Sequence, residues 1–432
     1  MMKRALAIVA GVVALAAGGL AAAYFLTRQP ELARTSERPS FGRKTVSQGE
    51  VLAGLGGCAT CHTAEGGAPF AGGRAIETPF GVLYASNITP HPESGIGGWS
   101  REAFARAMRR GVSRTGALLY PAFPYDHFTR ASDEDIDALY AYFMQGVQPE
   151  PARPPANAMA FPFNIREGLA LWNALFLKPG PGAAEPGKDE EWSRGAYLAQ
   201  GLGHCGACHS PRNQLGAVDA SRAYSGALVN GWYAPALNAQ SPAPAPWTKA
   251  SLANYLTDGW DKAHGIAAGS MTPVVDALRE LPEDDVFAVA AYVASLDTRS
   301  EAEKAELARK AQAFAEQAEW DPQGRDAKPS DDPGARVFQA RCAECHRAGG
   351  RSVPLGLNSP LNQPDPTNVV RVVFAGIKPP RGALGKSMPA LGAQMSDQEA
   401  AALVRFLRAR FTTREAWTDV EEVIGRERAR RP

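Results

Sequence analysis

The stretch Cys58-Ala-Thr-Cys-His62 introduces a pattern that accounts for every cysteine in the chain. The same spacing returns in Cys205-Gly-Ala-Cys-His209 and again in Cys342-Ala-Glu-Cys-His346. Two thiols separated by two residues can form thioethers with the two vinyl groups of one porphyrin, and the adjoining imidazole can then bind the iron from one face of the ring. The pattern therefore predicts three sites at which haem c is attached covalently.

This spacing predicts a role for each cysteine and each histidine of the motifs. The predicted thioether sites are Cys58, Cys61, Cys205, Cys208, Cys342 and Cys345. The predicted proximal iron ligands are His62, His209 and His346. Structural zinc is disfavoured because its ligands come from cysteine pairs close to each other, whereas these pairs are far apart in the sequence. A thioredoxin-like redox pair is disfavoured because it belongs to one βαβ unit and would not recur at near-even intervals.

A helical pattern follows each haem motif. Ser132 and Ser396 each stand three positions before an acidic residue and ahead of apolar residues at helical spacing, which is the signature of a capping box. Pro282 takes the same place in the middle repeat, although proline cannot cap through its side chain. We expect each helix to pack against the helix that carries the haem motif. The aromatic residues at the ends of these patterns are Tyr142, Tyr292 and Phe406.

The length and the repeats predict the domain organisation. At about 150 residues per domain, 432 residues suggest about three domains. The predicted fold is mainly α, with three tandem haem domains behind an N-terminal membrane helix. The expected segments are 1–30 (transmembrane anchor or signal), 42–147 (haem domain 1), 148–190 (Pro-rich structured connector), 191–298 (haem domain 2), 299–332 (charged helical linker), 333–415 (haem domain 3) and 416–432 (basic tail).

The segments outside the haem domains are expected to differ in character. The first connector contains Phe161-Pro-Phe-Asn-Ile-Arg166 and a short apolar helix near Leu169–Leu177, so we expect it to be structured. Ser300 caps an Ala/Glu/Lys-rich helix that we expect to be a solvated spacer. The tail Arg426–Pro432 is expected to be a solvated end, with contact to anionic headgroups or to a partner's acidic residues as the alternative.

Charge excludes one class of partner, and hydropathy points to a membrane. The net charge of +1 offers no basic surface for nucleic acid.

As a helix, the apolar run Ala5–Leu26 would reach about 33 Å, enough to cross a bilayer. The alternative is a cleaved signal peptide with Ala21-Ala-Ala23 at its cleavage site, but Tyr24-Phe-Leu26 continues the run beyond it. Because haem c is attached outside the cytoplasm, we expect one anchor in a bacterial inner membrane and a soluble part facing the periplasm.

We expect the other axial ligand of each iron to lie downstream of the haem motif. A haem that only transfers electrons has protein ligands on both faces, whereas a haem that binds substrate leaves one face open. In domain 3, Met388 lies in a loop ahead of the Ser396 helix, and it is the predicted sixth ligand. In domain 2, Met271 lies in the corresponding loop Gly269–Pro273 and is predicted to do the same.

Domain 1 departs from this pattern. Its loop Tyr120–His127 has Phe123 where a methionine would be expected, and phenylalanine cannot bind iron. His127 is the preferred replacement and would give bis-histidine ligation with a lower reduction potential. Met108 is the second candidate, and an open iron is the third possibility. The histidines interpreted as bonded or solvated side chains, not as ligands, are His91, His204 and His264.

Several short segments outside the motifs carry a family resemblance. They are Thr78-Pro-Phe-Gly81, Asn87-Ile-Thr-Pro90, Gly95-Ile-Gly-Gly-Trp99, Gly111-Val-Ser-Arg114, Leu119-Tyr-Pro-Ala-Phe-Pro124 and Cys205-Gly-Ala-Cys-His-Ser-Pro-Arg-Asn213. With three haem motifs, the chain resembles the triheme cytochrome c subunits of membrane-bound bacterial dehydrogenases. That family serves quinoprotein alcohol dehydrogenases, flavin-dependent gluconate and sorbitol dehydrogenases, and molybdenum hydroxylases that act on aldehydes, nicotinate or isoquinoline.

The resemblance implies three tandem cytochrome c domains in an electron-transfer subunit with no catalytic site of its own. Such a subunit accepts electrons from a periplasmic catalytic partner and delivers them to ubiquinone or a terminal oxidase. Phe123 and Asp126-His-Phe-Thr129 are similar to the branch that serves molybdenum hydroxylases, which implies a molybdenum-cofactor large subunit with an iron-sulfur small subunit as partner. The alternatives are a cytochrome subunit of a quinoprotein alcohol or flavin sugar dehydrogenase and, from another class, a multihaem peroxidase-like enzyme with an open haem in domain 1.

Overall fold

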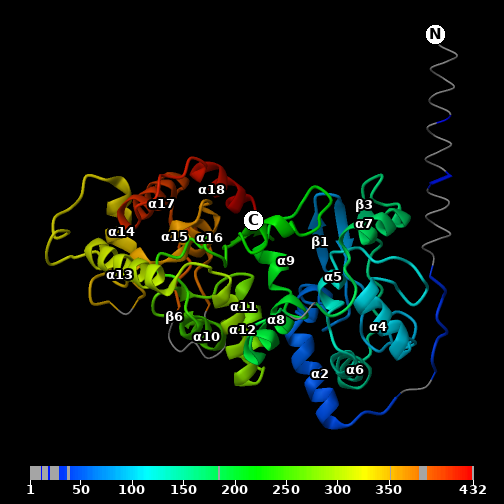
Figure 1. Ribbon diagram of the computed structural model, residues 1–432. Coiled ribbons are helices and arrows are strands. Elements are labelled where there is room, and N and C mark those ends of the chain that lie inside the picture. Colours follow the sequence, from blue (N-terminus) through cyan, green and yellow to red (C-terminus); the bar gives the residue numbers. More distant parts are fainter. Residues whose placement is uncertain are drawn as a thin grey trace. The chain divides into compact units, whose positions relative to one another are not determined.

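The computed structural model describes residues 29–36, 39–182, 185–350, 352–378 and 387–430, together with Gly11, Gly18 and Gly19. This chain divides into two compact units (Figure 1). Unit 1 consists of the chain up to Glu185 with Gln200–His204 and Asn213–Ala217. Unit 2 consists of Pro186–Ala199, Cys205–Arg212 and the chain from Val218. The first haem motif therefore belongs to unit 1, and the second and third belong to unit 2.

The expected membrane anchor lies almost entirely outside the described residues. Among the residues that are described, no helix is both long enough and apolar enough to cross a membrane. The anchor therefore stays a prediction that rests on the composition of Ala5–Leu26.

Unit 1 is mainly helical, with one small sheet. Its helices are α2 (Arg43–Leu55), α3 (Cys58–His62), α4 (Arg101–Arg110), α5 (Tyr125–Phe128), α6 (Asp133–Ala141), the π-helix η1 (Tyr142–Gly146), the 3-10 helix η2 (Arg166–Gly168) and α7 (Leu169–Phe176). Its antiparallel sheet has the order β1 (Ala75–Thr78), β2 (Gly81–Tyr84) and β3 (Ala158–Met159). The buried core includes Phe104 of α4 and Ile136 and Leu139 of α6. The connector after domain 1 is thus structured, because it supplies β3, η2 and α7.

Unit 2 contains the remaining helices and two short hairpins. The helices of its first half are α8 (Glu190–Gln200, of which Gln200 belongs to unit 1), α9 (Cys205–His209), η3 (Ala220–Arg222), α10 (Lys249–Asp258), α11 (Met271–Leu278), α12 (Glu283–Ser295) and α13 (Glu301–Ala318). Those of its second half are α14 (Pro333–Arg341), η4 (Leu355–Leu357), α15 (Ser359–Asn362), α16 (Thr367–Ala375), η5 (Gly392–Gln394), α17 (Asp397–Phe411) and α18 (Val420–Ala429). The hairpins are β4 (Ala227–Val229) with β5 (Trp232–Ala234), and β6 (Trp260–Asp261) with β7 (Gly265–Ile266).

The same helix crossing occurs three times, and each crossing has a glycine at its contact. A Cβ atom on Gly49 of α2 would lie 1.9 Å from the carbonyl oxygen of Ala138 in α6. The corresponding distances are 1.9 Å from Gly195 to Ala288 and 2.2 Å from Gly334 to Ala402. The aromatic residues at these crossings are those singled out from the sequence: Tyr142, Tyr292 and Phe406. The partner helix precedes the haem motif in the chain and does not contain it, which corrects the expected pairing.

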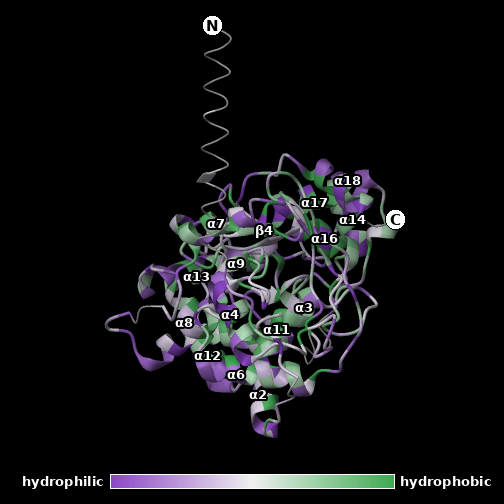
Figure 2. Ribbon diagram, turned by 90° about the vertical axis from the view of Figure 1, so that its right-hand side faces the viewer, coloured by the Kyte–Doolittle hydropathy of each residue, from purple (hydrophilic) through white to green (hydrophobic). Residues whose placement is uncertain are grey.

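The predicted starts of these helices are confirmed. The hydroxyl of Ser132 accepts a hydrogen bond from the backbone N–H of Asp135, and Ser396 forms a complete capping box with Glu399. Pro282 makes no side-chain cap, as expected. Helix α6 carries both hydrophilic and hydrophobic residues, as an amphipathic helix requires (Figure 2).

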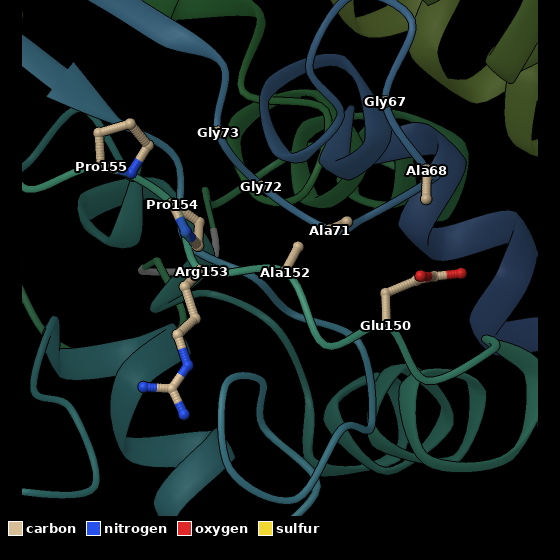
Figure 3. A pocket seen from close by; sticks show the side chains of 10 residues that line it. All are labelled: Gly67, Ala68, Ala71, Gly72, Gly73, Glu150, Ala152, Arg153, Pro154 and Pro155. Carbon is tan, nitrogen blue, oxygen red and sulfur yellow. The ribbon is translucent and has the colours of Figure 1, made fainter.

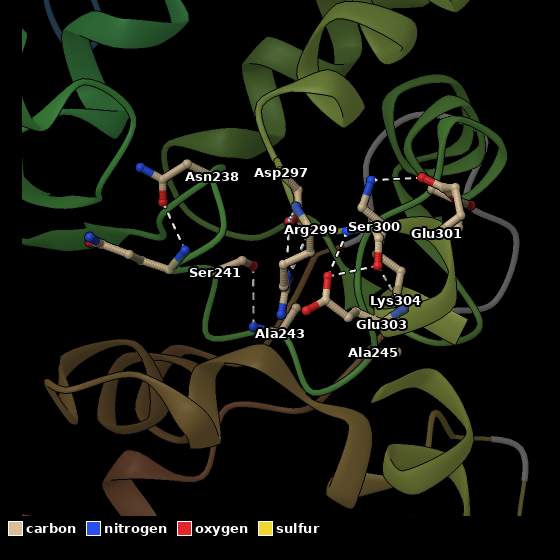
Figure 4. Close-up of polar contacts among 12 residues, drawn as sticks. Asn238, Ser241, Ala243, Ala245, Asp297, Arg299, Ser300, Glu301, Glu303 and Lys304 are labelled. Carbon is tan, nitrogen blue, oxygen red and sulfur yellow. Dashed lines mark hydrogen bonds and ion pairs between the residues drawn. The ribbon is translucent and has the colours of Figure 1, made fainter. Parts of the chain in front are cut away.

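Helix α13 is not the solvated spacer that its composition suggests. The expected capping box between Ser300 and Glu303 is present (Figure 4). However, Ala315 is completely buried, and it forms a small cluster with Ala245 and Leu357. The helix therefore packs inside unit 2, between the loop that follows β5 and the 3-10 helix η4. Alanines at helical spacing form an apolar face on α13. The many charged residues in its sequence led to the prediction of a solvated helix.

The C-terminal tail is not a solvated end either. Val420, Val423 and Ile424 of α18 are buried in the core of domain 3. The guanidinium of Arg428 donates hydrogen bonds to the carboxylate of Asp397 at 2.8 Å and to the carbonyl of Met395 at 2.6 Å. Arg426, Arg428 and Arg430 therefore bond within the protein, while the apolar face of α18 packs in the core.

Domains 2 and 3 are joined within unit 2 by specific polar contacts. The side chain of Asn368 in α16 accepts a hydrogen bond from the backbone N–H of Tyr233 and donates one to its carbonyl, both at 2.8 Å. The buried Arg371 pairs with Glu427 at 2.8 Å and lies over the Trp232 ring. These bonds fix the β4–β5 hairpin of domain 2 against α16 and α18 of domain 3.

Candidate haem-binding sites

The first motif forms a single short helix with its imidazole held in one tautomer. Gly57, with φ of 61°, lies between α2 and α3 and is the N-cap residue of α3. The Nδ1 of His62 lies 2.6 Å from the carbonyl oxygen of Ser86. A carbonyl can only accept, so Nδ1 carries the proton and Nε2 has a free lone pair. This is the tautomer that a histidine needs in order to bind iron through Nε2.

The second motif repeats this arrangement. It forms α9, and the Nδ1 of His209 donates to the carbonyl of Pro235 at 2.7 Å. Burial lowers the pKa of His62 and of His209, although the hydrogen bonds to Ser86 and Pro235 act in the opposite direction. Both imidazoles are therefore neutral near pH 7, which is the form that ligates a metal.

The third motif differs from the other two. Cys342–His346 follows α14 as a series of turns and not as a helix. The Nδ1 of His346 is buried and has no hydrogen-bond partner among the residues that the structure describes. Burial also lowers the pKa of His346, so this imidazole is neutral as well. Residue 351 and residues 379–386 of the same domain lie outside the described part of the chain.

The six cysteines share one property, which is that their sulfur atoms are not joined in pairs. None of them forms a disulfide. Burial, reinforced by the neighbouring thiol of each pair, raises the pKa of Cys58 and of Cys205 to about 12. A redox-active pair has the opposite property, a lowered thiol pKa that stabilises the thiolate. Within the described ranges, no group of three or more His, Cys, Asp or Glu side chains is placed so that it could hold a metal ion.

The first two motifs therefore fit haem c. Each presents two cysteines that form no disulfide, within one helical turn, and a neutral imidazole whose Nδ1 donates to a backbone carbonyl. The third motif presents the cysteines and the neutral imidazole, but no carbonyl of the described residues contacts its Nδ1. The acceptor carbonyls of Ser86 and Pro235 could not be found from the sequence, because a backbone acceptor leaves no signal in residue type.

In domain 1, His127 has the same tautomer as His62 and His209, with the proton on Nδ1. It lies on α5, and its Nδ1 donates to the carbonyl of Gln200 at 3.0 Å. Its ring makes an edge contact with His204, with 6.3 Å between the ring centroids. The Nε2 of His204 lies 3.3 Å from the carbonyl of Gly56, two residues before Cys58. His127 is thus brought into the neighbourhood of the first haem motif.

The other candidates for this position are less suited to bind iron. Met108 of α4 is only 6% exposed, so protein atoms already cover its thioether. Phe123 makes an edge contact with Phe128 and packs against the cluster formed by Tyr125, Trp172 and Ala217. The position that would hold a methionine therefore belongs to an aromatic cluster in this chain.

The two predicted methionine ligands occupy different settings. Met388 pairs with Ile377 through two backbone hydrogen bonds of 2.9 and 3.1 Å, and both Met388 and Cys342 pack against the core of domain 3. Met271 is the first residue of α11, so it starts a helix instead of lying in a loop as expected. Its side chain is partly exposed. Ligation of iron by either methionine stays a prediction.

The remaining histidines behave as expected from the sequence. His264 uses both ring nitrogens, with Nδ1 2.7 Å from the Asp261 carboxylate and Nε2 3.1 Å from the carbonyl of Ala245. The Nδ1 of His91 accepts from the backbone N–H of Ser94 at 3.2 Å, so the proton of its neutral ring is on Nε2. Neither histidine offers a free Nε2 lone pair.

A small pocket lies beside domain 1's motif but does not belong to it. Its volume is about 230 Å³, and it is formed by the glycine-rich segment from Gly67 to Gly73 and by the segment from Glu150 to Pro155 (Figure 3). Neither cysteine of the motif nor His62 lines it. Ligand pockets usually exceed about 300 Å³, so this hollow is not a site for a porphyrin.

Two family models match the chain. The model described as "Cytochrome c" matches residues 193–297, and the model described as "Cytochrome C oxidase, cbb3-type, subunit III" matches residues 329–407. These ranges contain the second and third motifs. The matches therefore support covalently bound haem c in the two domains of unit 2.

Curated relatives match nearly the whole chain. The chain is 43% identical to a nicotinate dehydrogenase subunit of Pseudomonas putida over 90% of its own length, but it spans only 32% of that longer protein. It is 37% identical to the gluconate 2-dehydrogenase cytochrome c subunit of Pantoea cypripedii, covering 84% of this chain and 85% of that one. It is 36% identical to the cytochrome c subunit of the quinone-dependent alcohol dehydrogenase of Gluconobacter oxydans, covering 84% and 78%. The chain therefore belongs to the family of cytochrome c subunits of dehydrogenases.

Proposed function

We propose that this chain is the triheme electron-transfer subunit of a dehydrogenase complex. Bound haem c supplies reversible one-electron chemistry at its iron. The observation that carries the proposal is the arrangement in α3 and α9, where two cysteines that form no disulfide accompany an imidazole held in the ligating tautomer. The third motif supports a third haem through its spacing and its buried, neutral His346.

The chain's own residues would close both faces of each iron. His62, His209 and His346 would bind from the proximal side, and His127, Met271 and Met388 from the other. For domain 1 the structure favours His127 over Met108, because His127 has a free Nε2 whereas Met108 is covered by protein. With all three irons closed, the chain would carry electrons and have no catalytic site of its own.

The partner that we propose is a periplasmic dehydrogenase of the molybdenum type, with a molybdenum-cofactor large subunit and an iron-sulfur small subunit. The 43% identity to the nicotinate dehydrogenase protein, against 37% and 36% to the gluconate and alcohol dehydrogenase subunits, supports this choice. Electrons would leave towards ubiquinone or a terminal oxidase. We further propose that Ala5–Leu26 anchors the chain in the inner membrane with both units in the periplasm.

A carbon monoxide difference spectrum of the undenatured, reduced protein tests this function. Carbon monoxide binds only to an iron with an open face, so electron transfer through closed irons predicts no binding. Binding at about one third of the haems would instead support the peroxidase-like alternative. The subunits that co-purify with the chain test the partner, and a flavin or quinone-cofactor catalytic subunit would contradict the molybdenum assignment.

The substitution His127→Ala tests the ligand set of domain 1. It should convert one low-spin haem to high-spin in the electron paramagnetic resonance spectrum, because the iron loses its strong-field sixth ligand. The matched control is His264→Ala, since both nitrogens of His264 are occupied within the protein. An unchanged spectrum for His127→Ala would show that this histidine does not bind iron.

A further inference from the structure

Among the described residues of unit 1, five large apolar side chains are exposed, and electron transfer does not explain their exposure. Their exposed fractions range from 42% to 80%. We call these residues the apolar patch: Phe161, Phe163, Leu171, Leu175 and Leu215. Exposed apolar side chains that cluster in this way mark interaction sites on soluble domains.

Helix α7 supplies the centre of the apolar patch. Its sequence Leu-Ala-Leu-Trp-Asn-Ala-Leu-Phe contains one polar residue, Asn173, whose amide oxygen accepts a hydrogen bond from the Tyr125 hydroxyl at 2.7 Å. Trp172 is buried on the same inner side. The outer face therefore presents Leu171 and Leu175, which lie one turn apart, with no polar side chain between them. A helix that is apolar on its outer face as well needs a second apolar environment.

The other members of the apolar patch are held next to α7. The indole N–H of Trp172 donates to the carbonyl of Leu215 at 3.0 Å. The ring of Phe163 lies 4.6 Å from the ring of Phe80, and Phe80 in turn approaches Gly216. Figure 1 shows α7 beside β3, the strand that leads into Phe161. These contacts bring Phe163 and Leu215 close to α7.

The continuous part of the described chain starts at Gln29 and is bonded to the loop that also contacts the residues before α7. The backbone N–H of Leu32 donates to the carbonyl of Arg114 at 2.9 Å, and the Arg106 guanidinium donates to the carbonyl of Pro30 at 2.8 Å. The loop that receives Leu32 continues to Leu118, whose carbonyl accepts from Arg166 at 2.8 Å, directly before α7. One loop therefore holds both the start of the described chain and the helix of the apolar patch. The apolar run Ala5–Leu26 ends just before that start.

We propose that the apolar patch inserts into the lipid bilayer that the Ala5–Leu26 segment anchors. The proposal rests on the membrane anchor of the proposed function. A lipid surface fits better than other occupants because only Thr27 and Arg28 separate the apolar run from Gln29, whose carbonyl lies against Gly116 of unit 1. Lys178, exposed directly after α7, suits the headgroup region above such a patch. The patch would hold unit 1 in one orientation on the membrane.

Fluorescence from the full-length holoprotein in phosphatidylethanolamine/phosphatidylglycerol vesicles tests this proposal. A polarity-sensitive dye is attached at Leu175→Cys, since the native cysteines are consumed by haem. The control is Glu134→Cys, an exposed residue of α6, which Figure 1 shows at the opposite end of unit 1 from α7. The dye at position 175 should emit at shorter wavelength and be quenched several-fold more by nitroxide-bearing lipid chains. The further substitution Leu171→Glu should reduce that quenching.

The outcomes separate the patch from the anchor. Equal quenching at positions 175 and 134, in protein that stays on the vesicles through an alkaline carbonate wash, would overturn the patch but not the anchor. Loss of the protein in that wash would contradict the anchor. Shielding of the dye at position 175 only after the catalytic subunit is added would also overturn the proposal, because the patch would then be a protein interface.

Discussion

Gly49, Gly195 and Gly334 are the residues on which the three helix crossings depend. Each allows a backbone carbonyl of the partner helix to approach closer than any side chain would permit. The sequence predicted the aromatic residues at these crossings but not the glycines. The glycine's role arises from a helix that lies far away in the sequence, whereas the helical pattern that ends in the aromatic residue is local. The haem motifs were predictable for the same reason, since all their chemistry is contained in five consecutive residues.

The substitution Gly334→Ala should destabilise unit 2. The new Cβ would lie 2.2 Å from the carbonyl oxygen of Ala402 and 2.5 Å from the Cβ of Phe406, so α14 and α17 would have to separate. Overpacking of this kind costs about 1–3 kcal/mol in the free energy of unfolding. Denaturant unfolding of the holoprotein, followed by circular dichroism, measures this loss.

The matched control for that prediction is Gly425→Ala. Gly425 lies in α18 of the same domain, and no atom lies within 4 Å of the position that its Cβ would take. This control should raise the free energy of unfolding by up to about 1 kcal/mol, because alanine favours a helix more than glycine. Equal effects of the two substitutions would show that the crossing does not require glycine.

At the scale of elements, caps were easier to predict than packing. The caps at Ser132, Ser300 and Ser396 depend on residues three positions apart, and each serine accepts the expected hydrogen bond from the backbone N–H three residues later, with a complete capping box at Ser300 and Ser396. The sequence analysis does not predict the burial of α13 and α18, because both helices contain many charged residues. Spacing would have indicated it, since the buried alanines of α13 and the buried aliphatic residues of α18 recur at three- and four-residue intervals.

Helix α13 can be tested by the same substitution on its two faces. Ala315 is completely buried against Ala245 and Leu357, so Ala315→Glu would place an unpaired charge in the interior of unit 2. We expect it to lower the free energy of unfolding by at least about 3 kcal/mol. Ala313 is exposed on the same helix, and Ala313→Glu should change it by less than about 0.5 kcal/mol. If the two substitutions changed the free energy of unfolding by similar amounts, measured by thermal or denaturant unfolding, the interpretation of α13 as a solvated spacer would be correct.

The turn between β6 and β7 should make the stability of unit 2 depend on pH. Burial alone would raise the pKa of Asp261, but hydrogen bonds from His264 and from the backbone N–H of Ala263 hold it below its usual value. A lowered carboxyl pKa contributes stability at neutral pH that is lost as the pH falls below about 4.

The variant Asp261→Asn measures that contribution. At pH 7 it should unfold more easily than the wild type by about 1.5–3 kcal/mol, the usual range for hydrogen bonds to a charged group. The difference should shrink as the pH is lowered from about 4 towards 2. A difference that stayed constant over this range would show that the Asp261 carboxylate does not contribute through its charge.

At the scale of the whole molecule, the repeats predicted three similar domains, and the structure arranges them unequally. Unit 1 holds one haem motif, whereas unit 2 holds two motifs in one packed body. The bonds from Asn368 to Tyr233 and from Arg371 to Glu427 account for part of this union. Such contacts involve single residues from distant segments, and no sequence period marks them. Family membership, in contrast, followed from the motifs and is shown by the relatives.

The number of covalently bound haems is the most direct test of the account. Pyridine haemochrome analysis, combined with the protein concentration and the intact mass of the full-length holoprotein, gives this number. We predict three haems per chain, all retained after extraction with acidified acetone, because thioethers at all six cysteines would resist it. Fewer than three haems per chain, or release of any of them into the acetone, would contradict the account.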